Sequence, residues 1–257
     1  MTTIGEIYHY IDGFAPFHTQ MGFDNAGLLA GSPKDAVNTV LLALDITPAV
    51  VREAAARGAE LVISHHPVIF NPLKRLEPET APYLLAKHGV AAICAHTNLD
   101  MAAQGGVNAC LAQKLGLKDI RTLHQDEASG LPDALMGDLE TPLAPRAFAQ
   151  YVRDALGCDG VRYTDGGREI TRVGLCSGGG EDWFYYAAQA DCQAFVTGES
   201  KHHILLDAEN AHVTLVNAGH YYTECVVLEP LKTRLSEQFP AIRFVLSQKM
   251  HSPAKFI

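Results

Sequence analysis

Two adjacent histidines, His65 and His66, follow the apolar run at residues 61–63 and precede Pro67. Imidazole is a good ligand for divalent transition-metal ions, so the pair is a candidate metal site. The alternative is a structural pair whose rings bond backbone groups in a loop. Adjacent side chains on an extended chain point to opposite sides. The chain must therefore turn here, or each histidine must bind its own ion.

Two further segments combine a histidine with a carboxylate four residues away. His96 precedes Asp100, and His220 precedes Glu224. Residues four apart share one face of a helix, so each histidine could bind the same ion as its carboxylate. The alternatives are that Asp100 caps a turn, that His96 supports a ligand through a hydrogen bond, and that Glu224 only complements a helix dipole.

Together the three segments offer six metal-binding side chains: His65, His66, His96, Asp100, His220 and Glu224. One catalytic zinc ion uses three protein ligands, so six donors fit two ions better. In two-metal hydrolases the ions lie ~3.5–4 Å apart, and we expect Glu224 to bridge them. Mixed imidazole and carboxylate ligands predict iron, zinc or manganese and disfavour calcium.

The second half of the chain holds further candidates. Glu199, His202 and His203 mirror the position of the first histidine pair. We predict that they transfer protons or support metal ligands, and a solvent-exposed helix start is the alternative. The segment 177–180 (Ser-Gly-Gly-Gly) opens a helix after a strand. It predicts either an anion-binding turn or a tight strand–helix turn.

The elements that position these residues follow from alternating apolar runs and helical segments. Six runs of strand length end where the candidate residues begin, at Asp45, Ser64, His96, Ser177, Thr197 and His220. Strands that alternate with helices predict mostly parallel sheets, whose sites form beyond the carboxyl ends of the strands. We therefore predict an α/β fold of two intertwined, duplicated halves with mixed, mostly parallel sheets. The metal site is expected at the carboxyl ends of strands, between the halves.

The boundary between the halves is expected near residue 124, giving halves of residues 1–124 and 125–257. Residues 119–141 are polar and turn-rich, which is typical of a linking segment. One long helix is expected to start near His220 and to reach about Gln238. Asp24 and Asn25 are interpreted as turn formers, with a place in a pocket as the alternative.

The composition excludes several classes of function. The chain has 257 residues, 47% of them hydrophobic and 19% charged, which fits a globular protein with a sizeable core. It has no apolar run near ~20 residues and no basic-then-apolar leader, so we expect a cytoplasmic protein without a membrane partner. Its six cysteines form no CxxC, so reduced thiols are expected. A net charge of −9 disfavours duplex nucleic acid as a partner.

Five motifs in this order resemble the dinuclear metal-centre family related to the yeast NGG-interacting factor: SHHP, HTNLD, CSGGG, TGExxHH and GHYxTE. The bacterial members of that family are GTP cyclohydrolase I type 2 homologues, and FDNAGLLAG near the start extends the resemblance over essentially the whole chain. It implies two intertwined α/β halves, a toroidal homohexamer, and metal ligands at His65, His66, Asp100, His220 and Glu224, with His96 in some members. The chain differs in having Phe23 where tryptophan is common, and it lacks the inserted domain of longer members.

The residues and the resemblance together predict a metal-dependent hydrolase that acts on a small, nucleotide-like substrate. A hydroxide between the two ions would be the nucleophile, and with GTP it would attack C8 of the purine. The alternative function belongs to a different class: a ring-shaped protein that stores or delivers metal, or binds a partner, without turnover.

Overall fold

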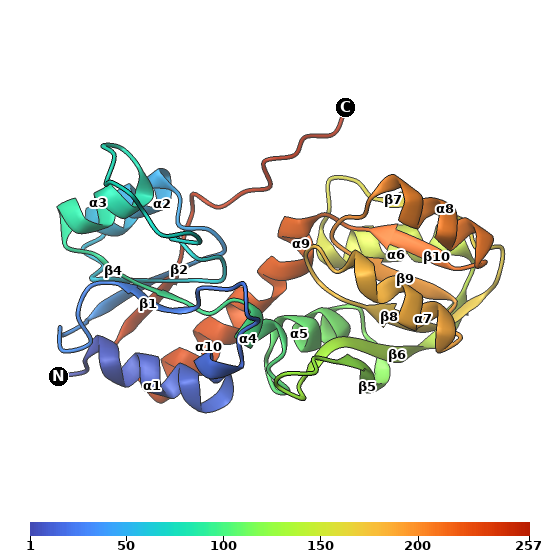
Figure 1. Ribbon diagram of the computed structural model, residues 1–257, viewed down its shortest axis with the longest axis horizontal. Coiled ribbons are helices and arrows are strands. Elements are labelled where there is room, and N and C mark those ends of the chain that lie inside the picture. Colours follow the sequence, from blue (N-terminus) through green and yellow to red (C-terminus); the bar gives the residue numbers. More distant parts are fainter. The chain divides into compact units, whose positions relative to one another are not determined.

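The computed structural model describes residues 1–257, which form two compact α/β units. Unit 1 contains Met1–Leu99 and Leu228–His251, and unit 2 contains Asp100–Val227 and Ser252–Ile257 (Figure 1). Unit 2 begins at Asp100, before the boundary expected near residue 124, and the chain after residue 227 returns to unit 1 and adds the last strand of its sheet. The duplication of the two halves stays a prediction.

The sheet of unit 1 has five strands in the order β1-β4-β3-β2-β11. Four of them run parallel: β2 (Thr39–Ala43), β3 (Leu61–Ser64), β4 (Ala91–Cys94) and β11 (Arg243–Leu246). The edge strand β1 (Gly27–Ala30) pairs antiparallel with β4. Every residue of β3 and β4 is buried, as expected of parallel strands covered on both faces.

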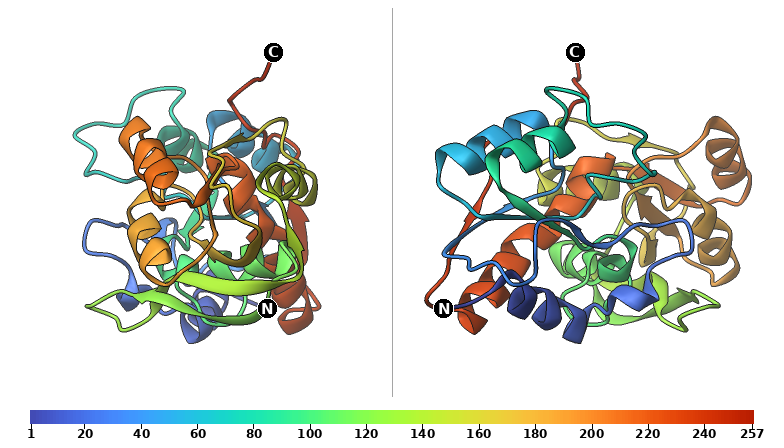
Figure 2. Two further views of the ribbon diagram at one scale, coloured as in Figure 1. Left: turned by 90° about the vertical axis from the view of Figure 1, so that its right-hand side faces the viewer. Right: turned by 60° about the vertical axis from the view of Figure 1, so that its left-hand side comes forward.

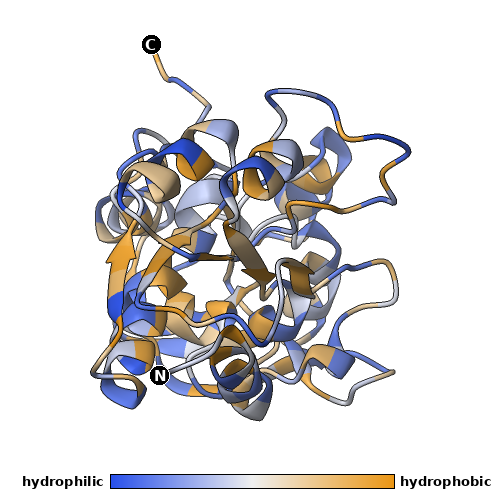
Figure 3. Cartoon of the chain, turned by 90° about the vertical axis from the view of Figure 1, so that its left-hand side faces the viewer, coloured by the Kyte–Doolittle hydropathy of each residue, from blue (hydrophilic) through white to orange (hydrophobic).

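Helices cover both faces of this sheet (Figures 1 and 2). On one face lie α2 (Pro48–Ala56) and α3 (Ala81–His88), which bury their apolar side chains against β2 and β3. On the other face lie α1 (Ile4–Phe14) and α10 (Leu228–Gln238). The strands are mostly orange in Figure 3 and the helices carry both colours, which is the pattern of buried strands under amphipathic helices.

The sheet of unit 2 has six strands in the order β5-β6-β8-β9-β10-β7. Its parallel centre consists of β8 (Ile170–Leu175), β9 (Ala194–Thr197) and β10 (Thr214–Asn217). The antiparallel flanks are β5 (Lys118–Gln125), β6 (Pro132–Leu143) and β7 (Arg162–Tyr163). Both units thus have mixed sheets with a parallel core, which confirms the predicted α/β class.

Unit 2 is also layered, with helices on both faces of its sheet. On one face α5 (Val107–Lys114) and α6 (Pro145–Leu156) pack into one hydrophobic core. On the other face α7 (Phe184–Gln189) and α8 (His202–Asn210) pack into a second core. Successive residues of β9 contribute to opposite cores, as the two-residue period of a strand requires.

Two predictions about local structure were wrong. Residues 119–141 were expected to link the halves, but they lie largely in the β5–β6 hairpin of unit 2. Their polarity reflects an antiparallel flank that faces water on one side. The single helix expected from residue 220 to residue 238 is interrupted, since α9 (His220–Glu224) is followed by a 3₁₀ turn at Cys225–Val227 before α10 begins.

The remaining short elements complete the chain. Further 3₁₀ turns occur at Phe17–Thr19 and Glu181–Trp183, and α4 (Thr97–Asp100) follows β4. None of the helices is both long and apolar enough to cross a lipid bilayer.

Candidate metal centre

The carboxyl edge of the unit 1 sheet brings three predicted ligands together. His65 and His66 directly follow β3, and His96 comes two residues after β4. Because β3 and β4 are parallel neighbours, their ends lie at the same edge. One ring nitrogen of each histidine lies within 4.8 Å of those of the other two, and the ring centroids are 5.1–5.6 Å apart. We call these three residues the histidine cluster.

Each imidazole of the histidine cluster is held through its Nδ1 atom. The acceptors are the carbonyl oxygen of Ala95 for His65 at 2.9 Å, the carboxylate of Asp45 for His66 at 2.7 Å, and the carboxylate of Asp24 for His96 at 2.8 Å. An oxygen acceptor requires the proton on Nδ1, which puts the lone pair of each ring on Nε2. Metal-binding histidines in proteins are oriented in this way, with the outer ring N–H bonded to a carboxylate or carbonyl.

Asp24 is a fixed carboxylate. Its side chain is fully buried, and besides His96 it accepts hydrogen bonds from the backbone N–H of Thr97 at 3.0 Å and from the Thr97 hydroxyl at 2.5 Å. Burial by itself raises the pKa of Asp24, but the hydrogen bonds from His96 and Thr97 outweigh it and lower the pKa to about 2. The carboxylate therefore stays ionised at neutral pH and supports His96.

Unit 2 presents a second pair of predicted ligands on the single helical turn α9. His220 begins this turn and Glu224 ends it, and the four-residue spacing brings His220 Nε2 to 3.1 Å from a carboxylate oxygen of Glu224. Glu224 is buried, whereas the His220 side chain is 39% exposed. The Nδ1 atom of His220 bonds the carboxylate of Glu199 at 3.0 Å, which repeats the arrangement of the histidine cluster.

The glycine-rich turn after β8 makes room for Glu224. Gly178 has a φ of +59°, and a Cβ atom there would clash with the Glu224 carboxylate. The backbone N–H of Gly178 bonds the Thr223 hydroxyl at 3.1 Å, and that of Ser177 bonds the side-chain oxygen of Asn108 at 2.9 Å. Two amides of the turn are thus used inside unit 2, which favours the tight-turn interpretation over the anion-binding one.

Asp100, the last residue of α4, belongs to unit 2. Its negative charge helps to raise the pKa of Cys176, a buried thiol, well above the usual range. Burial is the main cause, and the negative charges of Asp100, Asp133 and Glu224 add to it. The charges of Asp100 and Glu224 therefore both raise the pKa of the same buried thiol of unit 2.

The three predicted proton-transfer residues lie in different surroundings. The carboxylate of Glu199 is 65% exposed and bonds His220, so it can support a ligand, which was one of its two predicted roles. His202 and His203 are exposed in the first turn of α8. A role in proton transfer stays a prediction for all three.

A family model described as Duf34/NIF3 (NGG1p interacting factor 3) matches residues 2–253. The chain belongs to this family. A "GTP cyclohydrolase 1 type 2 homolog" of Clostridium perfringens is 27% identical over 99% of each chain, and one of Lactococcus lactis is 32% identical over 81% of this chain and 82% of its own. A crystal structure of a Staphylococcus aureus hypothetical protein covers 100% of this chain and 99% of its own, with a TM-score of 0.92 and 29% identity.

Two carboxylates of this Duf34/NIF3 protein orient the histidine cluster and were not predicted as its supports from the sequence. Asp45 follows β2, which is the parallel neighbour of β3, the strand that precedes His65. The position of Asp45 at the end of this neighbouring strand was the available signal. Asp24 was interpreted mainly as a turn former, and only the pocket alternative pointed towards its contact with His96. The contact joins residues 72 positions apart, so no local pattern reveals it.

The side chains present fit divalent transition-metal ions. Histidines oriented through Nδ1 and a buried carboxylate next to an imidazole provide the nitrogen and oxygen donors that iron, zinc and manganese accept. The glycine at residue 178 leaves the space that the Glu224 carboxylate occupies.

Proposed function

We propose that this Duf34/NIF3 protein holds two divalent metal ions, of iron, zinc or manganese, on six side chains: His65, His66, His96, Asp100, His220 and Glu224. One observation carries the proposal: all four histidines bond an oxygen acceptor through Nδ1, so their Nε2 atoms are the ones that would bind metal. Three acceptors are carboxylates, which increase the basicity of the imidazoles they hold.

We propose further that the histidine cluster of unit 1 and the Asp100, His220 and Glu224 side chains of unit 2 serve the same centre. Donor chemistry supports this, because unit 1 supplies only imidazoles and unit 2 supplies the carboxylates that can bridge two ions. The family resemblance of the five motifs supports it as well.

The proposed reaction is hydrolysis of a small, nucleotide-like substrate. The names of the curated relatives support the substrate class, since they are GTP cyclohydrolase 1 type 2 homologues. Divalent ions held by such ligands supply Lewis acidity to a substrate or to water. Glu199 holds the His220 ring through Nδ1, and His202 and His203, three and four residues further on, are the proposed proton carriers.

A combined metal and turnover measurement tests this function. Purified protein reloaded with iron, zinc or manganese should hold two ions per chain and should hydrolyse GTP or a member of a panel of nucleotides, phosphoesters and cyclic amides. Asp100→Ala should lose both bound metal and turnover. If loaded wild-type protein turns over no member of the panel, or if Asp100→Ala behaves identically, the hydrolase proposal fails.

The second candidate is a metal-handling or adaptor protein without turnover. The exposure of His220 and of its supporting carboxylate, Glu199, favours it, because solvent-accessible ligands allow exchange of metal. It predicts that a chelator removes the metal within minutes and that deletion disturbs metal balance in the cell. Metal that resists chelation while a substrate is processed would count against it.

The proposed assembly is a cytoplasmic homohexamer, as the family resemblance implies. Light scattering on the purified protein tests this assembly. We expect a mass near that of six chains, and the mass of a monomer would contradict it.

A further inference from the structure

Two large aromatic side chains of unit 1 are exposed: Phe23, which directly precedes Asp24, and Phe70, four residues after His66. Phe23 is 61% exposed and Phe70 is 46% exposed, although most large apolar side chains of this unit are buried. Their ring centroids lie 6.3 Å apart with an angle of 38° between the planes. We call these two residues the phenylalanine pair. Exposed aromatic rings so close together offer a stacking surface for a planar ligand.

Each ring of the phenylalanine pair neighbours, in sequence, a residue that takes part in a hydrogen bond between the loops or with the histidine cluster. Phe23 precedes Asp24, whose carboxylate holds His96. Phe70 follows Ile69, whose carbonyl oxygen accepts a hydrogen bond from the side-chain N–H of Asn25 at 2.6 Å. The two loops that carry the rings are thus joined to each other and to the His96 imidazole. A ring bound here would have a defined position relative to the cluster.

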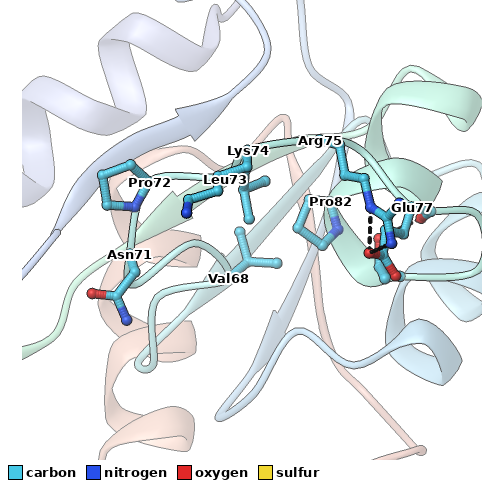
Figure 4. Close-up of a pocket in the computed structure, with 9 residues that line it drawn as sticks. Val68, Asn71, Pro72, Leu73, Lys74, Arg75, Glu77 and Pro82 are labelled. Atoms are coloured by element: carbon cyan, nitrogen blue, oxygen red, sulfur yellow. Dashed lines mark hydrogen bonds and ion pairs between the residues drawn. The ribbon is translucent and has the colours of Figure 1, made fainter.

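A cavity of about 710 Å³ is lined by Val68, Asn71 and residues further along this loop, and Asn71 follows Phe70 in the sequence (Figure 4). Its apolar lining includes Val68, Leu73 and Pro82, and the exposed cations Lys74 and Arg75 also line it. Arg75 is paired with Glu77 at 2.6 Å. Lys74 is therefore the cation of this loop best placed to meet an anionic group. Ligand sites of this size accommodate molecules as large as a nucleotide.

We propose that the phenylalanine pair binds the heteroaromatic ring of a purine nucleotide by stacking, with the phosphates of the same molecule lying toward Lys74. This inference rests on the proposed function, because it names the substrate class of that site. Stacking on an aromatic side chain accepts any base, so the pair supplies affinity and Lys74 supplies preference for the phosphorylated form. The same patch could instead contact a second copy of the chain, and the experiment separates the two.

Saturation-transfer NMR measures the proposal directly, with GTP, guanosine and ribose 5-phosphate as probes. In wild-type protein the purine H8 proton of GTP and guanosine should receive saturation, with or without metal. Phe23→Ala and Phe70→Ala should each raise the dissociation constant for guanosine about tenfold. Phe23→Trp, which enlarges the stacking face, should lower it. Lys74→Ala should weaken GTP binding severalfold and leave guanosine unchanged.

Leu76→Ala is the matched control, because Leu76 is a 55% exposed apolar residue of the same loop that does not line the cavity. It should bind GTP and guanosine as wild type does. Equal guanosine binding by wild type and the two alanine variants overturns the proposal, and so does absence of H8 saturation in wild type. A change of oligomer mass without a change in guanosine binding assigns the patch to a second copy and also overturns it. Metal content of the same samples tests the proposed metal centre separately.

Discussion

The four candidate histidines are held by supports of very different burial. In unit 1 the carboxylate of Asp24 is fully buried behind His96 and the support of His65 is a backbone carbonyl, whereas the carboxylate of Asp45 behind His66 is 52% exposed. In unit 2 the carboxylate of Glu199 behind His220 is 65% exposed. A buried support cannot exchange its hydrogen bond for one to water, whereas an exposed one can. His65 and His96 are therefore held more rigidly than His66 and His220.

This difference in burial predicts which ligands determine metal affinity and which allow the bound metal to exchange. Preorganised ligands bind without a cost for ordering their side chains. We expect His65 and His96 to contribute most to the affinity for metal, and we expect substitutions of the His220 support to have smaller effects.

The largest effect is expected from removing a candidate ligand altogether, even one whose support is half exposed. His66→Ala should reduce metal affinity at least about 100-fold, since losing a ligand should cost at least as much as the 10–100-fold that supporting partners contribute. Titration calorimetry with zinc measures it. His88→Ala is the control, because His88 is exposed at the end of α3, and it should bind as wild type does. Similar losses in both variants would mean that the cluster is not the binding site.

Removing the buried support should come next. Asp24→Ala leaves the ring N–H of His96 and the N–H of Thr97 without this acceptor, so we expect metal affinity to fall 10–100-fold. Calorimetry at matched fold content, checked by circular dichroism, measures the change. Unchanged affinity in a folded Asp24→Ala protein would show that orientation through Nδ1 is unimportant at residue 96.

Unit 2 is tested through its glycine turn. Gly178→Ala puts a Cβ atom into the Glu224 carboxylate at a positive φ, so we expect about tenfold weaker metal binding and a loss of about 1–2 kcal/mol in the free energy of unfolding. Gly179→Ala is the matched control, since a Cβ atom there meets no atom within 4 Å. If the two variants bind metal equally well, the space at residue 178 does not serve Glu224.

The free energy of unfolding should also depend on pH differently for charged residues of the two units. In unit 1 burial raises the pKa of Glu53, but hydrogen bonds from Ser247 and Gln248 and the nearby Arg57 lower it below the ordinary value. A carboxylate whose pKa is lowered in the folded state stabilises the protein at pH values above its ordinary pKa. This stabilisation is lost as the pH falls through the folded-state pKa. Glu53→Gln should therefore cost about 1–2 kcal/mol at pH 7 and progressively less below about pH 4.

The comparison residue in unit 2 is Asp138, whose pKa is lowered chiefly by the Arg121 hydrogen bond but whose side chain is 33% exposed. Asp138→Asn should change stability less, by about 0.5 kcal/mol. Denaturant melts at pH 7 and pH 3.5 measure both variants. A pH-independent cost of Glu53→Gln would contradict the assigned role of its charge.

The smallest effect is expected at the exposed support. Glu199→Gln keeps an oxygen acceptor for His220 and removes only the charge, so metal affinity should fall two- to threefold, well below the loss in Asp24→Ala. The rate of zinc loss to a chelator should rise by the same factor. A loss equal to that of Asp24→Ala would abolish the contrast between buried and exposed supports.

The sequence predicted the positions of the candidate ligands better than their supports. The clustering of His65, His66 and His96 was predictable because short apolar runs alternate with helices, and parallel strand ends share one edge. Asp24 was not, because its contact with His96 spans 72 residues and its local pattern is that of a turn.

The two wrong predictions have different causes. Polar residues at 119–141 were interpreted as a linker, but an antiparallel flank tolerates polar side chains as well as a loop does. The break between α9 and α10 follows from tertiary structure, because the chain passes from unit 2 to unit 1 between residues 227 and 228. Helical periodicity alone continues through that point.

Anomalous diffraction from crystals of metal-loaded protein, measured on both sides of the absorption edge, tests the central claim most directly. The account predicts two peaks per chain, with ligands from the histidine cluster and from Asp100, His220 and Glu224. No anomalous peak at these side chains, or ions bound by the residues of one unit alone, would contradict it.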